Sequence, residues 1–208
     1  MPFIEHNDKR LLFIHVPKTG GTSVEAWMSQ VAPLRLRTVG VPASLKCTPQ
    51  HLRMSDFNQL FGKGYFHEAF CLVRNPFSRI ESEYRMRLSM HKSGFFKEGP
   101  EFSAWLETSL DRARKEPWLF DNHLRPQWEF VEKNVEVHKL ESGLDAALSA
   151  AAASIGLAFT GPAPRLLASG KEAGMRIEWE SSDIARVCDF YKRDFDTFGY
   201  STELPTLD

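Results

Sequence analysis

The sequence lacks the features that mark secreted, zinc-binding and membrane-spanning proteins. Its three cysteines, Cys47, Cys71 and Cys188, are far apart and form no CxxC pair, so they indicate neither a disulfide framework nor a zinc site. No run of about 20 apolar residues could span a membrane, and the first residues do not read as a signal peptide. These absences predict a soluble, cytoplasmic protein, since unpaired cysteines suit a reducing compartment.

The chain also lacks an excess of charge of either sign. Its 26 Lys and Arg residues face 27 Asp and Glu residues among 208, which gives no long-range attraction for nucleic acid or an anionic membrane. Any affinity for anions must therefore be local. The length predicts a single domain over residues 1–208.

The sequence does contain an alternation of apolar strands with helices. The predicted strands are residues 11–16 and 69–73, whose apolar runs are typical of parallel strands buried on both faces, and residues 135–140 as a third strand. The predicted helices are residues 22–32, 76–90, 144–154 and 183–195. Residues 33–49, 92–100 and 161–174 are predicted to be long surface loops. This order predicts an α/β fold, a three-layer sandwich around a central, mainly parallel sheet.

The first predicted strand leads into PKTGGTS at residues 17–23, where a helix begins. Backbone N–H groups and the positive end of the helix dipole converge at such a junction, so the segment suits an anion. The two glycines let the anion approach the backbone, Lys18 supplies an ammonium, and Thr22 and Ser23 supply hydroxyls. Taken alone, the segment could equally be a tight turn capped by Thr22.

The loop differs from that of nucleoside triphosphatases, which reads GxxxxGK[ST] with its lysine after the glycines. Here Lys18 precedes them, and no Asp that could hold Mg²⁺ ends an apolar strand. A P-loop kinase-like phosphotransferase, which would need ATP and Mg²⁺, is therefore the less favoured alternative.

A second strand-to-helix junction reads CLVRNPFSR at residues 71–79. Arg74 ends the strand, and Asn75 and Pro76 are expected to be the N-cap and first residue of the helix. Arginine can bind a phosphate through two parallel N–H bonds, and the hydroxyl of Ser82 could complete the site. On its own, Arg74 could instead be a salt-bridge or surface residue.

Both motifs together resemble those of PAPS-dependent carbohydrate sulfotransferases, the group that includes heparan and chondroitin sulfotransferases and bacterial relatives. HVPKTGGTS is similar to their 5'-phosphosulfate loop, and VRNPFSRIESEY to their 3'-phosphate motif. Weaker similarity extends through VEVHKLESGLDAALSAAAASIGL and DFYKRDFDTFGY. The resemblance implies a nucleotide-binding fold of the P-loop type. It also implies transfer of a sulfuryl group from 3'-phosphoadenosine 5'-phosphosulfate (PAPS) to an acceptor hydroxyl, on a carbohydrate, without a metal.

The resemblance also assigns residues. Those implied to bind the cofactor are Lys18, Thr19, Gly20, Gly21, Thr22, Ser23, Arg74 and Ser82. Lys18 would neutralise charge on the leaving group, while Arg74 and Ser82 would hold the 3'-phosphate. The family's usual Asp after the arginine is Asn75 here, which affects only a capping interaction.

The reaction needs a base for the acceptor hydroxyl, and histidine titrates in the right range. His51, in PQHLR, lies where related 2-O-sulfotransferases carry their catalytic histidine, and is the first candidate. His123, in DNHLRPQ, resembles a His-x-x-Pro-Gln segment near the acceptor site, and is the second, as base or acceptor binder. Either could instead be a structural or surface histidine, and His15 is expected to be packed in the core.

The acceptor itself is the least constrained part of this interpretation. Positive side chains that could line a groove for an acidic glycan, or simply face solvent, are Arg53, Arg85, Arg87 and Lys92. A non-catalytic module that binds a nucleotide or glycan is the remaining alternative, and binding without turnover would identify it.

Overall fold

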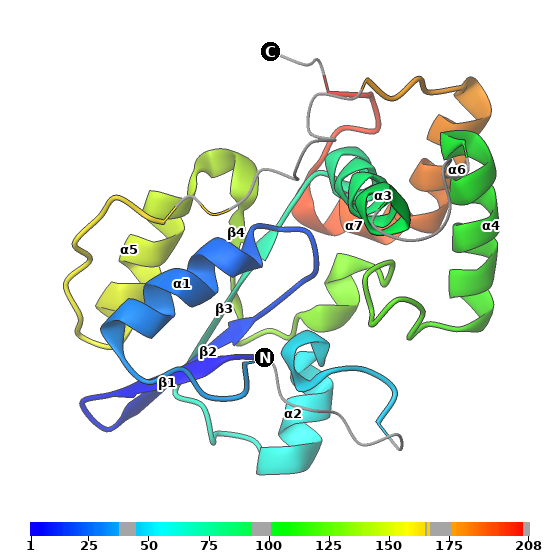
Figure 1. Cartoon of the computed structure of the whole chain (residues 1–208). Coiled ribbons are helices and arrows are strands. Elements are labelled where there is room, and N and C mark those ends of the chain that lie inside the picture. Colours follow the sequence, from blue (N-terminus) through cyan, green and yellow to red (C-terminus); the bar gives the residue numbers. More distant parts are fainter. Residues whose placement is uncertain (38–44, 93–100, 165, 167–175, 206–208) are drawn as a thin grey trace. The chain divides into compact units, whose positions relative to one another are not determined.

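The computed structural model of the chain describes residues 1–37, 45–92, 101–164, 166 and 176–205 (Figure 1). The chain forms two compact units. The first comprises Met1–Arg74 and Glu129–Leu166, and the second Asn75–Trp128 and Leu167–Asp208. The assignment of residues 1–208 to a single domain stays a prediction. Within the described ranges, no helix has the length and apolar character needed to cross a bilayer.

A four-stranded sheet forms the centre of the first unit. Its strands are β1 (Phe3–His6), β2 (Lys9–Ile14), β3 (Glu68–Val73) and β4 (Glu136–Lys139), in the order β1-β2-β3-β4. The β1–β2 pair is antiparallel, whereas the β2–β3 and β3–β4 pairs are parallel. The mainly parallel sheet is thus confirmed, with β2, β3 and β4 at the predicted positions.

Strand β1 was not predicted. It joins β2 through Asn7 and Asp8, which both have positive φ angles of 47° and 60°. Two consecutive residues of this kind form the tight hairpin turn that matches the twist of antiparallel strands. The Asn-Asp pair was therefore the available signal for this hairpin.

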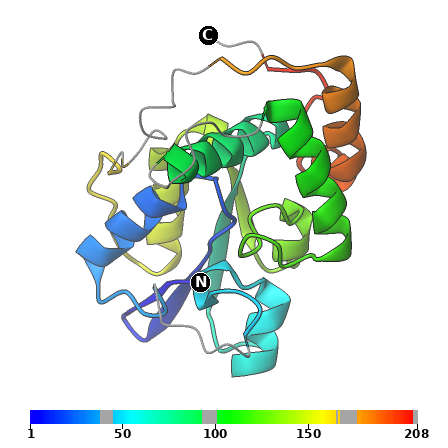
Figure 2. The ribbon, with the colours of Figure 1, turned by 45° about the vertical axis from the view of Figure 1, so that its right-hand side comes forward.

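Helices α1 (Gly21–Val31) and α5 (Leu144–Ser154) lie side by side over one face of the sheet (Figure 1, Figure 2). Buried apolar side chains of these helices and of the strands form one cluster, which includes Val24, Met28, Leu148, Phe13 and Phe70. The unit also contains α2 (Met54–Phe61) and the short 3-10 helices Pro49–His51 and Leu140–Ser142. Burial of the cluster fixes α1, and with it the loop that precedes α1, against the sheet.

The second unit is helical. It contains α3 (Pro76–Lys92), α4 (Phe102–Lys115), α6 (Ser181–Phe190) and α7 (Lys192–Phe198), and the 3-10 helix Gln127–Phe130 begins at its border. Its core includes Phe77, Leu106, Val187, Tyr191 and Phe195.

The structure of this unit differs from the prediction in two helical regions. The single helix expected over residues 183–195 is two helices, because Tyr191 has φ −103° and ψ 20°, which ends α6 before α7 begins. Helix α4 was not predicted at all.

The α/β class with a mostly parallel sheet flanked by helices is confirmed, while the three-layer arrangement and the P-loop type stay predictions. The predicted loops over residues 33–49, 92–100 and 161–174 lie partly outside the described residues.

Candidate functional site

The loop between β2 and α1 has the backbone shape of an anion site. Lys18 has φ 68° and Gly20 has φ 88°, so two of its residues adopt the left-handed conformation. Gly20 is the N-cap of α1, and no side chain caps this end. Such a loop turns successive N–H groups inward at the positive end of a helix, which is where phosphate and sulfate groups bind.

Several side chains of the loop hold its shape. The Thr19 hydroxyl is buried and donates to the carbonyl of Val16 at 2.8 Å. The Ser23 hydroxyl accepts from the Leu166 N–H at 3.0 Å. Thr22, by contrast, is exposed at the start of α1. Of the three predicted hydroxyl ligands, Thr22 is therefore the one most open to a ligand, and Thr19 and Ser23 position the backbone.

Arg74 lies beside this loop, as the two motifs predict. Strands β2 and β3 are adjacent and parallel, so the segments that follow them emerge at the same edge of the sheet. The Arg74 guanidinium donates to the Lys18 carbonyl at 3.4 Å. Two predicted cofactor residues from distant parts of the chain thus meet at one point. Ser82 lies on α3 in the second unit.

Behind the loop, a buried carboxylate holds His15. Glu25, on α1, is 2% exposed and its Oε1 lies 2.6 Å from His15 Nδ1 and 2.6 Å from Gln50 Nε2. Arg37 Nε lies 3.2 Å from the other oxygen. Three donors thus surround one buried carboxylate, which is the arrangement that makes burial of a charge tolerable.

These contacts determine the protonation states of His15 and Glu25. Burial lowers the pKa of His15 to about 4, although the hydrogen bond to Glu25 opposes the shift. Burial also opposes ionisation of Glu25, but the bonds from His15 and Gln50 and the charge of Arg37 outweigh it and lower its pKa. His15 is therefore neutral near pH 7 and donates its Nδ1 proton to an ionised Glu25. The expected core histidine is confirmed as buried, but it is hydrogen-bonded and not merely packed.

The His15 ring also explains one glycine of the loop. A Cβ atom placed on Gly21 would lie 2.1 Å from His15 Nε2. No side-chain atom can approach a ring that closely, so the first turn of α1 can pass His15 only with glycine at this position. Glu25 holds the His15 ring in place, and the ring in turn limits how closely the first turn of α1, at the predicted phosphate site, can approach it.

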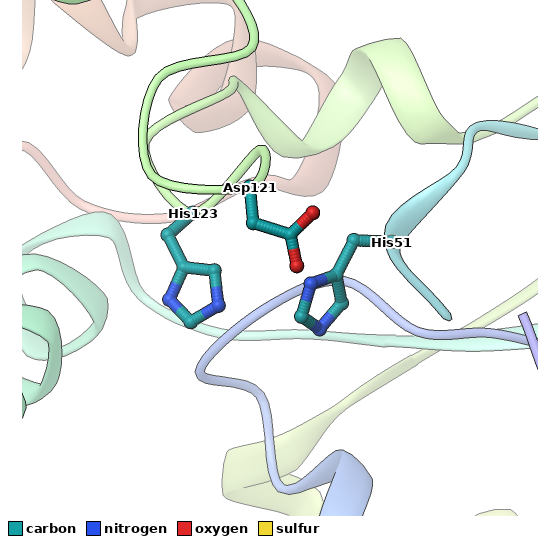
Figure 3. A group of neighbouring side chains, drawn as sticks. All are labelled: His51, Asp121 and His123. Atoms are coloured by element: carbon teal, nitrogen blue, oxygen red, sulfur yellow. The ribbon is translucent and has the colours of Figure 1, made fainter. Parts of the chain in front are cut away.

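His51, the first candidate for the base, lies at the end of the 3-10 helix Pro49–His51 in the first unit (Figure 3). It is 8% exposed, and its ring meets that of His15 edge-on with centroids 5.0 Å apart. The second candidate, His123, lies on a loop of the second unit, two residues after Asp121 (Figure 3).

The His123 loop has an unusual backbone that the rest of the unit holds in place. Three consecutive residues before His123, Phe120, Asp121 and Asn122, have positive φ angles of 54°, 60° and 65°. Each costs of the order of 1 kcal/mol or more outside glycine, so the surrounding structure must enforce the shape. Strain of this kind is concentrated at functional sites.

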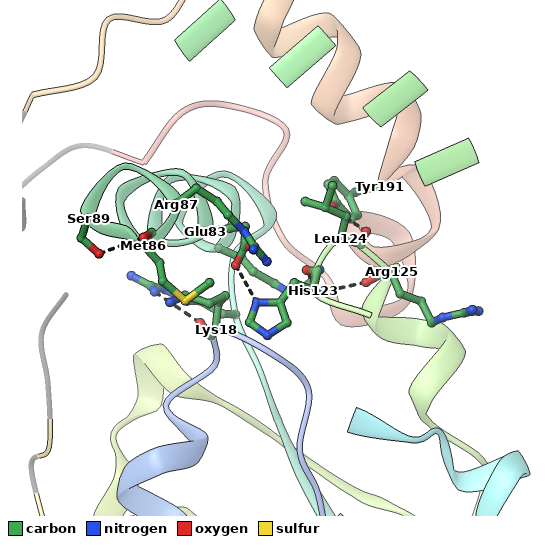
Figure 4. Close-up of polar contacts among 11 residues, drawn as sticks. Lys18, Glu83, Met86, Arg87, Ser89, His123, Leu124, Arg125 and Tyr191 are labelled. Atoms are coloured by element: carbon green, nitrogen blue, oxygen red, sulfur yellow. Dashed lines mark hydrogen bonds and ion pairs between the residues drawn. The ribbon is translucent and has the colours of Figure 1, made fainter. Parts of the chain in front are cut away.

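Two buried side chains hold the residues that follow this run by binding their carbonyl groups, and Figure 4 labels one of the two, Tyr191. Arg79 of α3 donates to the carbonyls of His123 at 2.8 Å and of Arg125 at 3.0 Å. The Tyr191 hydroxyl donates to the carbonyl of Leu124 at 2.8 Å. Three successive carbonyls of the loop are therefore anchored to the helical core.

The His123 side chain is held by Glu83 (Figure 4). Its Nδ1 lies 2.7 Å from Oε2 of Glu83, which is 1% exposed on α3 and whose Oε1 accepts from Arg87 Nε at 2.7 Å. Burial opposes ionisation of Glu83, but His123 and Arg87 outweigh it and lower its pKa to about 2. An ionised Glu83 accepts the Nδ1 proton, so Nε2 of His123 is left as the basic nitrogen.

Sequence reasoning missed Glu83, which binds His123, and Arg79, which binds the carbonyls of the His123 loop. A signal was present, because Arg79, Glu83 and Arg87 are spaced by four residues and therefore lie on one face of α3. Of the other predicted cations, Arg53 pairs with Asp56 at 2.7 Å and Arg85 with Glu81 at 3.0 Å. The side chain of Lys92 lies outside the described residues.

Comparison with known proteins gives one match. The model of the Sulfotransferase family matches residues 1–201. No curated protein and no solved structure matches the chain. The matched range contains both strand-to-helix motifs and both candidate histidines.

Proposed function

Because the chain belongs to the sulfotransferase family and is thus an enzyme of sulfuryl transfer, we propose that its donor is PAPS and its acceptor a carbohydrate hydroxyl. The observation that carries the donor assignment is the meeting of the two motifs at one edge of the sheet, with Arg74 bonded to the carbonyl of Lys18. A loop built for one anion beside an arginine suits a nucleotide with phosphates on both sides of its ribose.

The residues of the first unit bind the donor. The N–H groups at Gly20 and Gly21 and the Thr22 hydroxyl hold the 5'-phosphosulfate, and Thr19 and Ser23 keep the loop in shape. The Lys18 ammonium neutralises the charge that develops on the bridging oxygen as the sulfur–oxygen bond breaks. Arg74 binds the 3'-phosphate, while the predicted role of Ser82, which belongs to the second unit, is a separate expectation.

His123 serves as the base in this proposal, with His51 as the alternative. The acceptor oxygen attacks sulfur, its proton passes to Nε2 of His123, and 3'-phosphoadenosine 5'-phosphate leaves. Glu83 favours this step because its buried negative charge stabilises the imidazolium that forms. His51 remains the alternative because the sequence made it the first candidate. Alanine substitution at each of the two histidines tells which one is the base.

The donor assignment is tested by titrating the protein with 3'-phosphoadenosine 5'-phosphate and with ADP. We expect the 3'-phosphorylated nucleotide to bind at least about tenfold more tightly, as one charge-assisted contact provides. Arg74→Ala should remove the preference, whereas Arg186→Ala, at a half-buried arginine of α6 paired with Glu107, should keep it. Equal affinities in the wild type, or a requirement for ATP and Mg²⁺, would overturn the assignment.

Transfer itself is measured with PAPS labelled in its sulfate group and a panel of neutral and acidic sugars. We expect label in the sugar product, and we expect Lys18→Ala to lower the rate by orders of magnitude with unchanged folding. Nucleotide binding without any labelled product would instead identify a non-catalytic binding module.

A further inference from the structure

The second unit contains a pocket that none of the roles above uses. It has a volume of about 510 Å³ and lies among α3, α4 and Phe120. Its lining includes Trp105, Thr108 and Ser109 of α4. This volume is in the range of sites for small molecules, which are typically about 300–1,000 Å³.

The pocket combines positive charge with an aromatic wall. Arg87 and Arg112 both line it, and their guanidinium carbons lie 4.0 and 5.8 Å from the centre of the Phe120 ring. None of the described residues that line it is acidic. Such a pocket attracts an anion more strongly than an exposed arginine does, because its walls exclude part of the water.

The acidic partners of the two arginines, Glu83 and Glu116, do not remove the attraction of the pocket for an anion. Arg87 is bonded to the buried Glu83 through Nε and also lines the pocket. Among the described residues, the ion-pair partner of Arg112 is Glu116, at 3.9 Å, and both side chains are more than half exposed. An exposed pair of this kind contributes little, so Arg112 can turn to a bound anion.

We propose that this pocket binds the acceptor, which carries an oxyanion, a carboxylate or a sulfate, next to a ring with an apolar face. The two guanidinium groups match the planar edge of a carboxylate or two oxygens of a sulfate. The ring lies against Phe120 and Trp105, and the hydroxyls of Thr108 and Ser109 bond to those of the ligand.

The proposal rests on the proposed function in one respect, the identity of the ligand as the acceptor. Glu83 connects the two, because it binds Arg87 through one oxygen and His123 through the other. An oxyanion on Arg87 is therefore two contacts away from the proposed base. The pocket would select acceptors by their charge and place them on the side of α3 that carries the base.

The test uses three probes that differ in one group. They are p-nitrophenyl β-D-glucuronide, p-nitrophenyl 6-O-sulfo-β-D-glucoside and the uncharged p-nitrophenyl β-D-glucoside, each titrated calorimetrically into the whole protein. We expect at least one charged probe to bind about tenfold more tightly than the glucoside. Arg112→Ala should abolish that difference. The matched control is Arg114→Ala, on the same helix but paired with Asp189 at 2.7 Å and outside the pocket lining.

The outcomes separate this inference from the proposed function. Preference for the glucuronide or for the sulfated probe tells which oxyanion the pocket selects. No binding, equal binding of all three probes, or equal losses in Arg112→Ala and Arg114→Ala would overturn the inference. Binding that depends on Arg112, without labelled product from PAPS, would keep the pocket as an oxyanion site and refute the proposed reaction.

Discussion

At the scale of single residues, the Glu83–His123 pair makes the sharpest prediction. His123→Ala should lower kcat by about 10² to 10⁴, the usual contribution of a general base, without changing nucleotide affinity. Glu83→Gln should lower kcat less and move the acid limb of the rate profile to lower pH, because the imidazolium loses its neighbouring negative charge. Measuring kcat as a function of pH for the wild type and the two variants shows both effects.

The matched variant for this prediction is His51→Ala. If His51 is the base, that variant loses turnover and His123→Ala mainly raises KM for the acceptor. Such a result would move the base to His51 and leave the donor assignment untouched.

Gly21 gives a second prediction at this scale. Gly21→Ala would gain up to about 1 kcal/mol of helix propensity, but its methyl group would meet the His15 ring at 2.1 Å. Overpacking typically costs about 1–3 kcal/mol, so we expect the clash to dominate, with a lower free energy of unfolding and weaker nucleotide binding. In the double variant with His15→Ala, the added cost of the alanine at position 21 should largely disappear. Additive losses in urea unfolding would show that the ring is not the obstacle.

At the scale of secondary structure, the start of α3 tests the predicted cap. The Asn75 side-chain oxygen accepts from the Phe77 N–H at 2.9 Å, so the N-cap read from the sequence is confirmed. Asn75→Ala should lower the free energy of unfolding by about 1 kcal/mol. Asn75→Asp should keep or slightly raise it, since a negative charge suits a helix N-terminus. Equal stability of the Ala and Asp variants in urea would contradict the capping role.

The elements that the sequence predicted are those with strong local signals. Strands β2 and β3 are apolar on both faces, and α3 begins with Asn-Pro. By contrast, α4 mixes apolar residues with charges, and it is fixed by tertiary packing of side chains such as Trp105 and Leu106 in the helical core. The break at Tyr191 was missed for the same reason, because the residue is buried and its hydroxyl binds the carbonyl of Leu124.

At the scale of the whole chain, the sequence predicted that the loop of residues 17–23 and Arg74 lie together, but it did not predict the buried pairs behind them. Adjacent parallel strands bring the two motifs to one edge, and that topology can be read from apolar runs. The contacts of Glu25 with His15 and of Glu83 with His123 join residues 10 and 40 positions apart. No periodicity or motif encodes such pairs, because they depend on how packed elements place two buried groups.

The buried His15 also predicts how the stability of the chain depends on pH. Its pKa is lowered from 6.5 to about 4 in the folded protein, so between these values the unfolded chain binds the extra proton. The free energy of unfolding should therefore rise with pH from about 4 to 6.5 and then level off. The lowered pKa values of Glu25 and Glu83 act at lower pH, where protonation of these carboxylates removes further stability.

Urea unfolding between pH 5 and 6.5 isolates the histidine, since the carboxyl groups of Glu25 and Glu83, whose ordinary pKa is 4.5, are then largely ionised in both the folded and the unfolded state. We expect a gain of about 1–2 kcal/mol over this interval in the wild type, as each unit of pKa shift corresponds to about 1.4 kcal/mol. His15→Gln keeps a donor for Glu25 but cannot bind the proton, so its profile should be nearly flat. His6→Gln, at a histidine outside the buried pair, should keep the slope of the wild type. A slope that survives in His15→Gln would assign the pH dependence to other groups and contradict a neutral, buried His15.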